Sequence, residues 1–194
     1  MDADGLSSYT FACATSAEER VARRVGFETV RVGIGVANGV PQGRLVSFGV
    51  AGSLGVMQVG EVLDATRVVD ETGATLWEGP GLGARGARPG VLLGGAVLVH
   101  DAAERDRLRA ASGADAVDME SGTLARSGRL AGVVRAISDD ASSTVEGLDT
   151  TVHADGRTNV LGLLRWVATQ RADAVRSIRG ALRALKALEE AVAT

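Results

Sequence analysis

Two apolar stretches of the chain end in acidic residues, and these carboxyl groups are the side chains best suited to chemistry. Residues 114–121 read ADAVDMES, and residues 134–140 read VRAISDD. One interpretation is helix capping, because Asp and Ser side chains accept hydrogen bonds from the free N–H groups that open a helix. The other is a binding site, because open α/β sheets hold ligands at the carboxyl ends of their strands. The choice depends on the elements that carry these residues.

Glycines gather beside predicted strand ends. The segment 33–39 reads GIGVANG and has the Gly-x-Gly spacing of a dinucleotide-binding loop, but Pro41 prevents the helix that should follow such a loop. Two interpretations of this segment remain open. It is either a turn whose backbone N–H groups face an anion or a sugar, or a turn without a ligand. The segment 47–62 contains Gly49, Gly52, Gly55 and Gly60. Because glycine has no side chain, we expect this backbone to approach a ligand, with Gly52 at the binding site.

Apolar, β-branched segments alternate with helical patterns along the chain. Strands are predicted at residues 9–15, 28–34, 44–50, 61–69, 91–99, 114–118 and 131–137. Helices are predicted at residues 17–25, 102–111, 119–128, 158–170 and 171–192. This alternation indicates an α/β fold, with a single three-layer α/β/α domain over residues 1–194 and a central mixed sheet.

One connection in this fold is too short for an ordinary crossover. Parallel neighbouring strands need a crossover of about a dozen residues, usually a helix. Between the predicted strands at 28–34 and 44–50 the chain has only GVANGVPQG, with Pro41 and three glycines. The two strands are therefore antiparallel, or not adjacent, or they have lost a helix.

The first and the last helix have the clearest sequence patterns. In SAEE, Ser16 is expected to cap the first helix and Glu19 to reach back in a capping box, which leaves Glu18 free to face a site. In the last helix one apolar stripe is formed by Val175, Ile178, Leu182, Leu185, Leu188 and Val192. We expect this stripe to pack against the rest of the domain.

The composition argues against several classes of protein. The net charge is −3 and the arginines are scattered, with Lys186 the sole lysine, so nucleic acid is not an expected partner. No apolar run approaches the ~18 residues of a membrane span, and no signal peptide is expected. Cys13, the only cysteine, should be a buried small hydrophobe in a reducing cytoplasm. His100 and His153 lack the spacing of a metal pair, so we expect neither a metal nor another cofactor.

Three motifs taken together resemble a known family. The motifs are, in chain order, VSFGVAGSL with VGEVL, AVDMESGTLA and VRAISDDA. Their order and spacing resemble those of the purine nucleosidase and nucleoside phosphorylase superfamily, especially methylthioadenosine/adenosylhomocysteine nucleosidases. The tail VHADGRTNVLGLLRWVATQRADAVRSIRGAL is similar to a subgroup associated with hopanoid synthesis. The resemblance spans nearly the whole chain. It implies a nucleoside phosphorylase-like fold, a cytoplasmic enzyme that acts on a purine nucleoside, and a homodimer.

The resemblance also implies roles for individual residues. Cleavage of a ribosyl N–C bond passes through an oxocarbenium-like sugar, which requires an acid for the leaving base, an acceptor for the sugar hydroxyls and an activated water. Asp139, supported by Ser138, matches the residue that protonates or hydrogen-bonds N7 of the purine. Glu120 matches the carboxylate that binds the ribose hydroxyls, with Met119 against the sugar. Glu18 matches the glutamate that deprotonates the water.

Structural roles remain alternatives for these carboxyl groups. Asp118 is expected to be the cap of its helix, and capping or a turn would also explain Asp139. Glu120 would suit the first turn of a helix, where the helix dipole favours a negative charge, and Glu18 would suit an exposed helix face. The chain also departs from the family, because the aromatic residue that usually stacks on the purine is replaced by Leu98 or Val99 in GGAVLV.

Three functions therefore remain open. The first is hydrolysis of a 5′-substituted adenosine, of the methylthioadenosine, adenosylhomocysteine or adenosyl-hopane type, to release adenine. The second is a purine nucleoside phosphorylase of the same fold, which would need cationic contacts to phosphate from residues such as Arg31, Arg44 and Arg67. The third is a degenerate nucleoside-binding protein without turnover, which the missing helix and the missing aromatic residue would suit.

Overall fold

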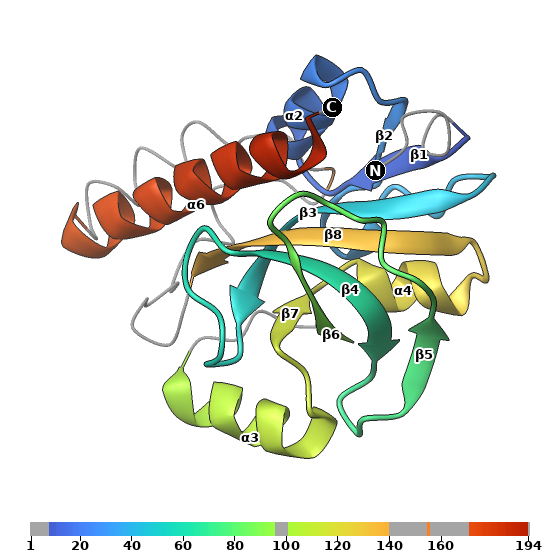
Figure 1. Cartoon of the computed structure of the whole chain (residues 1–194). Coiled ribbons are helices and arrows are strands. Elements are labelled where there is room, and N and C mark those ends of the chain that lie inside the picture. The colour runs from blue at the N-terminus through green and yellow to red at the C-terminus, as the bar shows by residue number, and fades with distance from the viewer. Residues whose placement is uncertain (1–7, 96–100, 140–154, 156–170, 194) are drawn as a thin grey trace.

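The computed structural model describes residues 8–95, 101–139, 155 and 171–193 (Figure 1). The strands are β1 (Thr10–Cys13), β2 (Thr29–Arg31), β3 (Leu45–Ser53), β4 (Val62–Val69), β5 (Thr75–Glu78), β6 (Arg88–Gly94), β7 (Ala116–Asp118) and β8 (Leu130–Asp139). The helices are α2 (Ser16–Arg24), the short 3-10 helix η1 (Ile34–Val36), α3 (Ala102–Ser112), α4 (Ser121–Arg126) and α6 (Arg171–Val192). Figure 1 shows α2 and α6 on one side of the sheet and α3 on the other.

The predicted strands all occur, and one further strand was not expected. β5 has the sequence TLWE, is partly exposed along its length and pairs with β4 in an antiparallel manner. No buried apolar run marks such a strand, because it lies at the edge of the sheet. The predicted helix at 158–170 and the last four residues of the predicted strand 91–99 lie outside the described residues.

The sheet is mixed, and five of its strands close into a ring. β3 pairs antiparallel with β7, which pairs parallel with β6, which in turn pairs parallel with β4. β8 completes the ring because it pairs parallel with β3 and antiparallel with β4. β1 and β2 extend the sheet beyond β3. The α/β fold with a mixed central sheet is confirmed, and the ring places the carboxyl ends of β3 and β8 side by side.

The short connection between β2 and β3 is explained by strand order. Both strands pair parallel with β1, one on each side, so they are not neighbours and the second of the three alternatives is confirmed. The connection contains η1 in place of an α-helix. Gly35 within η1 has φ +59°, a left-handed conformation that glycine adopts without a steric penalty.

Helix α6 occurs as predicted but buries a different face. Val175 is 45% exposed and Leu182 is 62% exposed, so the expected apolar stripe is wrong for the first half of the helix. The buried positions among the described side chains of the helix are Ser177, Gly180, Ala184, Leu188, Ala191 and Val192, so Leu188 and Val192 of the expected stripe are buried. The small residues let the helix lie close to β8, since a Cβ atom at Gly180 would collide with the backbone oxygen of Ser138.

Aromatic and aliphatic side chains fill the space between the sheet and α6. Phe11 and Phe48 from the sheet form one cluster with Leu188 and Val192 from α6. Cys13 lies in this cluster and is fully buried, as expected from the sequence. Burial raises the pKa of its thiol well above the ordinary value, so this cysteine is a core residue rather than a nucleophile.

Candidate active site

A buried arginine connects three strands. Arg135 on β8 is fully buried, and its Nη2 forms an ion pair with Oδ2 of Asp118 at the end of β7. The same nitrogen donates a hydrogen bond to Oγ of Ser47 on β3 at 2.6 Å and lies 3.4 Å from Oε2 of Glu120. A buried guanidinium needs such partners, because its removal from water is costly. Arg135 therefore determines where the neighbouring carboxyl groups lie.

Asp118 both caps a helix and forms an ion pair. Its carboxylate accepts a hydrogen bond from the backbone N–H of Ser121 at 3.2 Å, which is the capping contact expected at the start of α4. Its Oδ2 also pairs with Arg135. Asp118 thus contributes to the start of α4, although the N-cap position itself is Glu120, and the binding-site interpretation stays a prediction.

Glu120 lies at the start of α4 but does not cap it. Its Oε1 accepts a hydrogen bond from the backbone N–H of Gly35 at 3.0 Å, so the glycine turn of GIGVANG faces an anionic group of the protein itself. Burial raises the pKa of Glu120 to about 7, against the opposing effect of Arg135 and with smaller increases from Asp118 and Glu18. Near neutral pH this carboxyl group can therefore hold or release a proton.

Helix α2 is capped one residue earlier than expected. Thr15 is the N-cap, and Glu18 rather than Glu19 reaches back to it, with Oε2 accepting hydrogen bonds from Thr15 N at 2.7 Å and Thr15 Oγ1 at 2.9 Å. Ser16 cannot be the cap because it is already the first residue of the helix. Oε1 of Glu18 accepts a hydrogen bond from Val50 N at 2.9 Å. The expectation of a free Glu18 is wrong: the side chain is 2% exposed and fixed in place.

Glu18 and Arg135 meet at one glycine. A Cβ atom at Gly49 would collide with Oε1 of Glu18 and with Nη1 of Arg135. Both side chains therefore occupy the space that an ordinary residue at this position would need. Glu18, Asp118 and Glu120 together place three carboxyl groups around one guanidinium.

Asp139 ends β8 and is held by two hydrogen-bond donors. Oδ1 accepts from Ser138 Oγ at 2.8 Å, the contact expected from the sequence, and Oδ2 accepts from Nη2 of Arg105 at 2.6 Å. The side chain is still 17% exposed. Gly52 is paired with Asp139 across β3 and β8, and a Cβ atom there would lie 3.0 Å from Oδ2. Because Gly52 has no side chain, the carboxylate can lie directly against the backbone of β3.

The site residues form two groups along β8. Glu18 and Glu120 lie beside Arg135, whereas Asp139 lies four residues further along the strand, roughly 13 Å for an extended chain. Two such groups can contact different parts of one ligand. Leu98 and Val99, expected beside the base, lie outside the described residues.

Several solved structures share this arrangement of elements. The 5′-methylthioadenosine/S-adenosyl homocysteine nucleosidase of Helicobacter pylori matches with a TM-score of 0.59 at 16% identity, over 96% of this chain and 98% of that chain. The futalosine hydrolase of Helicobacter pylori matches with a TM-score of 0.57 at 16% identity, over 98% of this chain and 99% of that chain. The chain has the fold of these nucleosidases.

A third structure with the nucleosidase fold contains a ligand. It is the 5′-methylthioadenosine/S-adenosylhomocysteine nucleosidase of Neisseria meningitidis in complex with methylthio-immucillin-A, with a TM-score of 0.57 at 16% identity, over 92% of this chain and 99% of that chain. No protein-family model matches the chain, and no curated protein matches it by sequence. The activity must therefore be argued from the side chains that this nucleosidase fold brings together.

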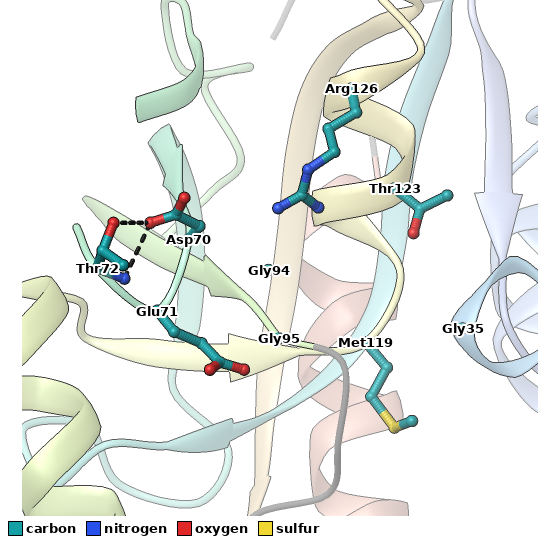
Figure 2. A pocket seen from close by; sticks show the side chains of 9 residues that line it. All are labelled: Gly35, Asp70, Glu71, Thr72, Gly94, Gly95, Met119, Thr123 and Arg126. Carbon is teal, nitrogen blue, oxygen red and sulfur yellow. Dashed lines mark hydrogen bonds between the residues drawn. The ribbon is translucent and has the colours of Figure 1, made fainter. Parts of the chain in front are cut away.

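A pocket of about 390 Å³ is lined in part by Gly35, which donates a hydrogen bond to Glu120, and by Met119 (Figure 2). Its lining is formed by Gly35, Asp70, Glu71, Thr72, Gly94, Gly95, Met119, Thr123 and Arg126. Figure 2 shows Met119 near Gly95, with Gly35 on one side and the turn at Asp70 and Thr72 on the other. Because Met119 precedes Glu120 directly, this pocket is next to the buried carboxyl groups. The contact of Met119 with a sugar stays a prediction.

The three arginines considered for phosphate binding lie apart from one another. Arg44 lies over the ring of Tyr9 at 4.7 Å and precedes the start of β3, whereas Gly52 is near the end of that strand. Arg67 is an exposed residue of β4, and Arg31 lies 3.8 Å from Glu19. Together they do not form one cationic site.

Arg135 is the residue of this site that the sequence interpretation missed. A single arginine within the apolar strand sequence VVRAI is itself a signal, since arginine is almost never fully buried unless it is paired. Among the described residues, no three potential metal ligands gather in one place. None of the helices in the described part of the chain has both the length and the apolar character needed to cross a membrane.

Proposed function

We propose that the chain hydrolyses the N-glycosidic bond of a 5′-substituted adenosine and releases adenine. The observation that carries this proposal is the pair of buried carboxyl groups, Glu18 and Glu120, beside Arg135, with Asp139 further along the same strand. The fold shared with nucleosidases supports it. Hydrolysis requires groups for the sugar, the water and the base, and this arrangement provides a carboxyl group for each.

The buried cluster favours positive charge on a bound sugar. Glu18, Asp118 and Glu120 outnumber the single guanidinium of Arg135, so the cluster is negative when its acids are ionised. An oxocarbenium-like transition state is positive, and fixed charges in a site with little water stabilise it more than they stabilise the neutral substrate. Glu120 would accept hydrogen bonds from the ribose hydroxyls, with Met119 against the sugar.

Glu18 retains the capacity to accept a proton from water. Oε2 already accepts two hydrogen bonds from Thr15, whereas Oε1 accepts one from Val50. A carboxylate oxygen has two acceptor positions, so Oε1 can take a further hydrogen bond from a water molecule. The rigid contacts of Glu18 would hold that water at a fixed position relative to the sugar.

Asp139 would contact the leaving base. Its carboxyl group, supported by Ser138, donates a proton to N7 of the purine or shares a hydrogen bond with it, which stabilises the base as it departs. The side chain of Asp139 is 17% exposed, which leaves part of it accessible for this contact.

Hydrolysis is favoured over phosphorolysis by the charge of the cluster. At about 4 Å and an effective dielectric constant near 20, two unit charges of the same sign repel by roughly 4 kcal/mol. A phosphate ion beside Glu18 would experience this repulsion, whereas water would not.

The decisive test is an assay of adenine release from adenosine, methylthioadenosine and adenosylhomocysteine, with and without millimolar phosphate. Adenine and a free sugar in phosphate-free buffer, lost in Glu18→Gln, would support hydrolysis. A sugar 1-phosphate formed only with phosphate would establish a phosphorylase. Adenine binding without release from any substrate would identify a binding protein. From the family resemblance we also propose a cytoplasmic homodimer, which sedimentation and cell fractionation test.

A further inference from the structure

A second buried arginine lies at the base side of the site, and none of the roles above uses it. Arg105 on α3 is 1% exposed. Its Nη1 donates a hydrogen bond to the backbone oxygen of Ser53 at 2.6 Å, and its Nη2 donates to Oδ2 of Asp139 at 2.6 Å. One side chain thus ties a helix to the ends of both β3 and β8.

Stability alone does not explain an arginine at this position. Arg105 lies three residues before Leu108, so both are on the buried face of α3, where an apolar side chain would pack. Buried ion pairs are often no more stabilising than apolar residues of similar volume. The arginine therefore has to be explained by what it does for its partner.

The contacts of Asp139 leave its carboxylate able to bind a further group. A carboxylate has about four acceptor positions, and here Arg105 occupies one on Oδ2 while Ser138 occupies one on Oδ1. Gly52 lets both side chains lie close to β3, since a Cβ atom there would be 3.0 Å from Oδ2 of Asp139 and 3.3 Å from Nη1 of Arg105. The carboxylate is thus fixed in orientation while 17% of the side chain remains exposed.

We propose that Arg105 is a positioning residue of the base subsite. It holds the carboxyl group of Asp139 and the end of β3 in one orientation, so that the free part of this group faces N7 of the leaving base and accepts a hydrogen bond once N7 carries the proton. Arg105 touches no substrate and acts only through Asp139. This inference rests on the proposed function, because it assigns the base to Asp139.

The first test replaces the guanidinium. Arg105→Gln should lower kcat by about 10- to 100-fold, since small errors in the position of a catalytic group have effects of this size, and Arg105→Lys should keep more activity than Gln because it keeps the charge. The matched control is Arg107→Gln on the same helix, whose side chain is 59% exposed and pairs with Glu104. Wild-type kcat in Arg105→Gln would overturn the proposal.

A double-mutant cycle separates positioning from a general structural role. If Arg105 acts through Asp139, adding Arg105→Gln to Asp139→Asn should change kcat by less than about threefold, whereas a general structural defect multiplies the two losses. Multiplied losses would overturn the proposal. Arg105→Gln alone leaves the Asp139 carboxylate without its charge partner, which can destabilise the fold. The double variant has no such carboxylate, so its kcat can still be compared with that of Asp139→Asn if Arg105→Gln alone does not fold.

Binding of adenine distinguishes failure of this inference from failure of the proposed function. Calorimetric titration of adenine should show weaker binding in Arg105→Gln and the same non-additivity with Asp139→Asn. If the wild type binds adenine but releases none from any substrate, the proposed function fails. The double-mutant cycle can then be measured with adenine affinities in place of kcat, and it still tests the role of Arg105. Losses that multiply in binding would overturn that role, and a protein that neither binds adenine nor releases it would overturn both.

Discussion

Glu120 is an acid whose protonation is decided mainly by burial. The nearby guanidinium of Arg135 favours the charged form, but removal from water favours the neutral form more strongly, and the pKa rises to about 7. A buried carboxyl group of this kind is costly to keep ionised in the folded protein. Such a cost is expected at a functional site, where stability is commonly reduced in favour of activity.

Replacement of Glu120 by glutamine should remove a pH-dependent part of the stability. Because the pKa is raised in the folded state, the folded protein binds more protons than the unfolded chain between about pH 4.5 and 7. The contribution of Glu120 to the free energy of unfolding is thus greatest below that window and is lost as the pH rises through it. Urea unfolding from pH 4.5 to 8 should show wild type losing stability relative to Glu120→Gln.

The control for this titration is Glu190→Gln, an exposed glutamate on α6. Its stability relative to wild type should not change over the same pH range. A constant difference between wild type and Glu120→Gln at every pH would contradict the raised pKa. In the same variant, hydrolysis should fall more than adenine binding, because adenine carries no sugar for Glu120 to contact.

Asp139 is the residue that we propose to contact the leaving base, and asparagine can replace it with little change in size. Asp139→Asn should lower kcat by about 100-fold or more, as the loss of a general acid does, while circular dichroism shows a retained fold. Asp106→Asn, an exposed position on α3, serves as the control and should keep the wild-type rate. Normal turnover of a purine nucleoside by Asp139→Asn would rule out its assigned role.

The elements hold these residues through close packing as well as through hydrogen bonds. Helix α6 lies over the end of β8, where Gly180 meets the backbone oxygen of Ser138. Arg105 on helix α3 donates a hydrogen bond to Asp139 at the same strand end. The position of Asp139 therefore depends on two helices that are far from it in sequence.

A methyl group at Gly180 should weaken both packing and catalysis. In an exposed helix, Gly→Ala is stabilising by nearly 1 kcal/mol, but at Gly180 the new Cβ atom would collide with Ser138, and such overpacking costs about 1–3 kcal/mol. Urea unfolding should show Gly180→Ala less stable than wild type, with a lower kcat. Arg179→Ala, an exposed neighbour on α6, should be close to neutral. If Gly180→Ala were more stable than wild type, α6 would not be packed against β8 as closely as described.

At the scale of the whole molecule, ring closure of the sheet assembles the site. β8 pairs with both β3 and β4, so residues from separate parts of the sequence meet along β3 and β8 and beside β7. Glu18 from α2 and Gly35 from η1 join them from outside the ring. A ligand bound here would contact elements from both the first and the last third of the described chain.

Binding of adenine should therefore stabilise the whole fold. At a concentration 100 times its dissociation constant, a ligand that binds only the folded state adds about 2.7 kcal/mol, which corresponds to a rise in Tm of roughly 5–10 °C for a chain of this size. Differential scanning fluorimetry should show this rise for wild type and a much smaller one for Asp139→Asn at the same adenine concentration. Equal shifts in the two proteins would place adenine elsewhere.

The sequence by itself determined the element order and the chemical character of the site. Buried strands are apolar and β-branched, so their positions were visible in the chain, and the acidic residues at 118, 120 and 139 marked strand ends. The capping contact of Asp101 on α3 is likewise a local feature, because a cap involves residues only three positions apart. For the same reason the cap of α2 was misplaced by only one residue.

Only the tertiary structure decided which residues meet. The pairing of Arg135 with Asp118, of Gly35 with Glu120 and of Arg105 with Asp139 joins residues between 17 and 85 positions apart, and no local pattern fixes such contacts. The insertion of β1 between β2 and β3 and the buried face of α6 also depend on what lies opposite each element. Burial and charge pairing depend on which residues are neighbours in space. The different environments of Glu18, Glu120 and Asp139 therefore follow from the tertiary structure and not from the local sequence.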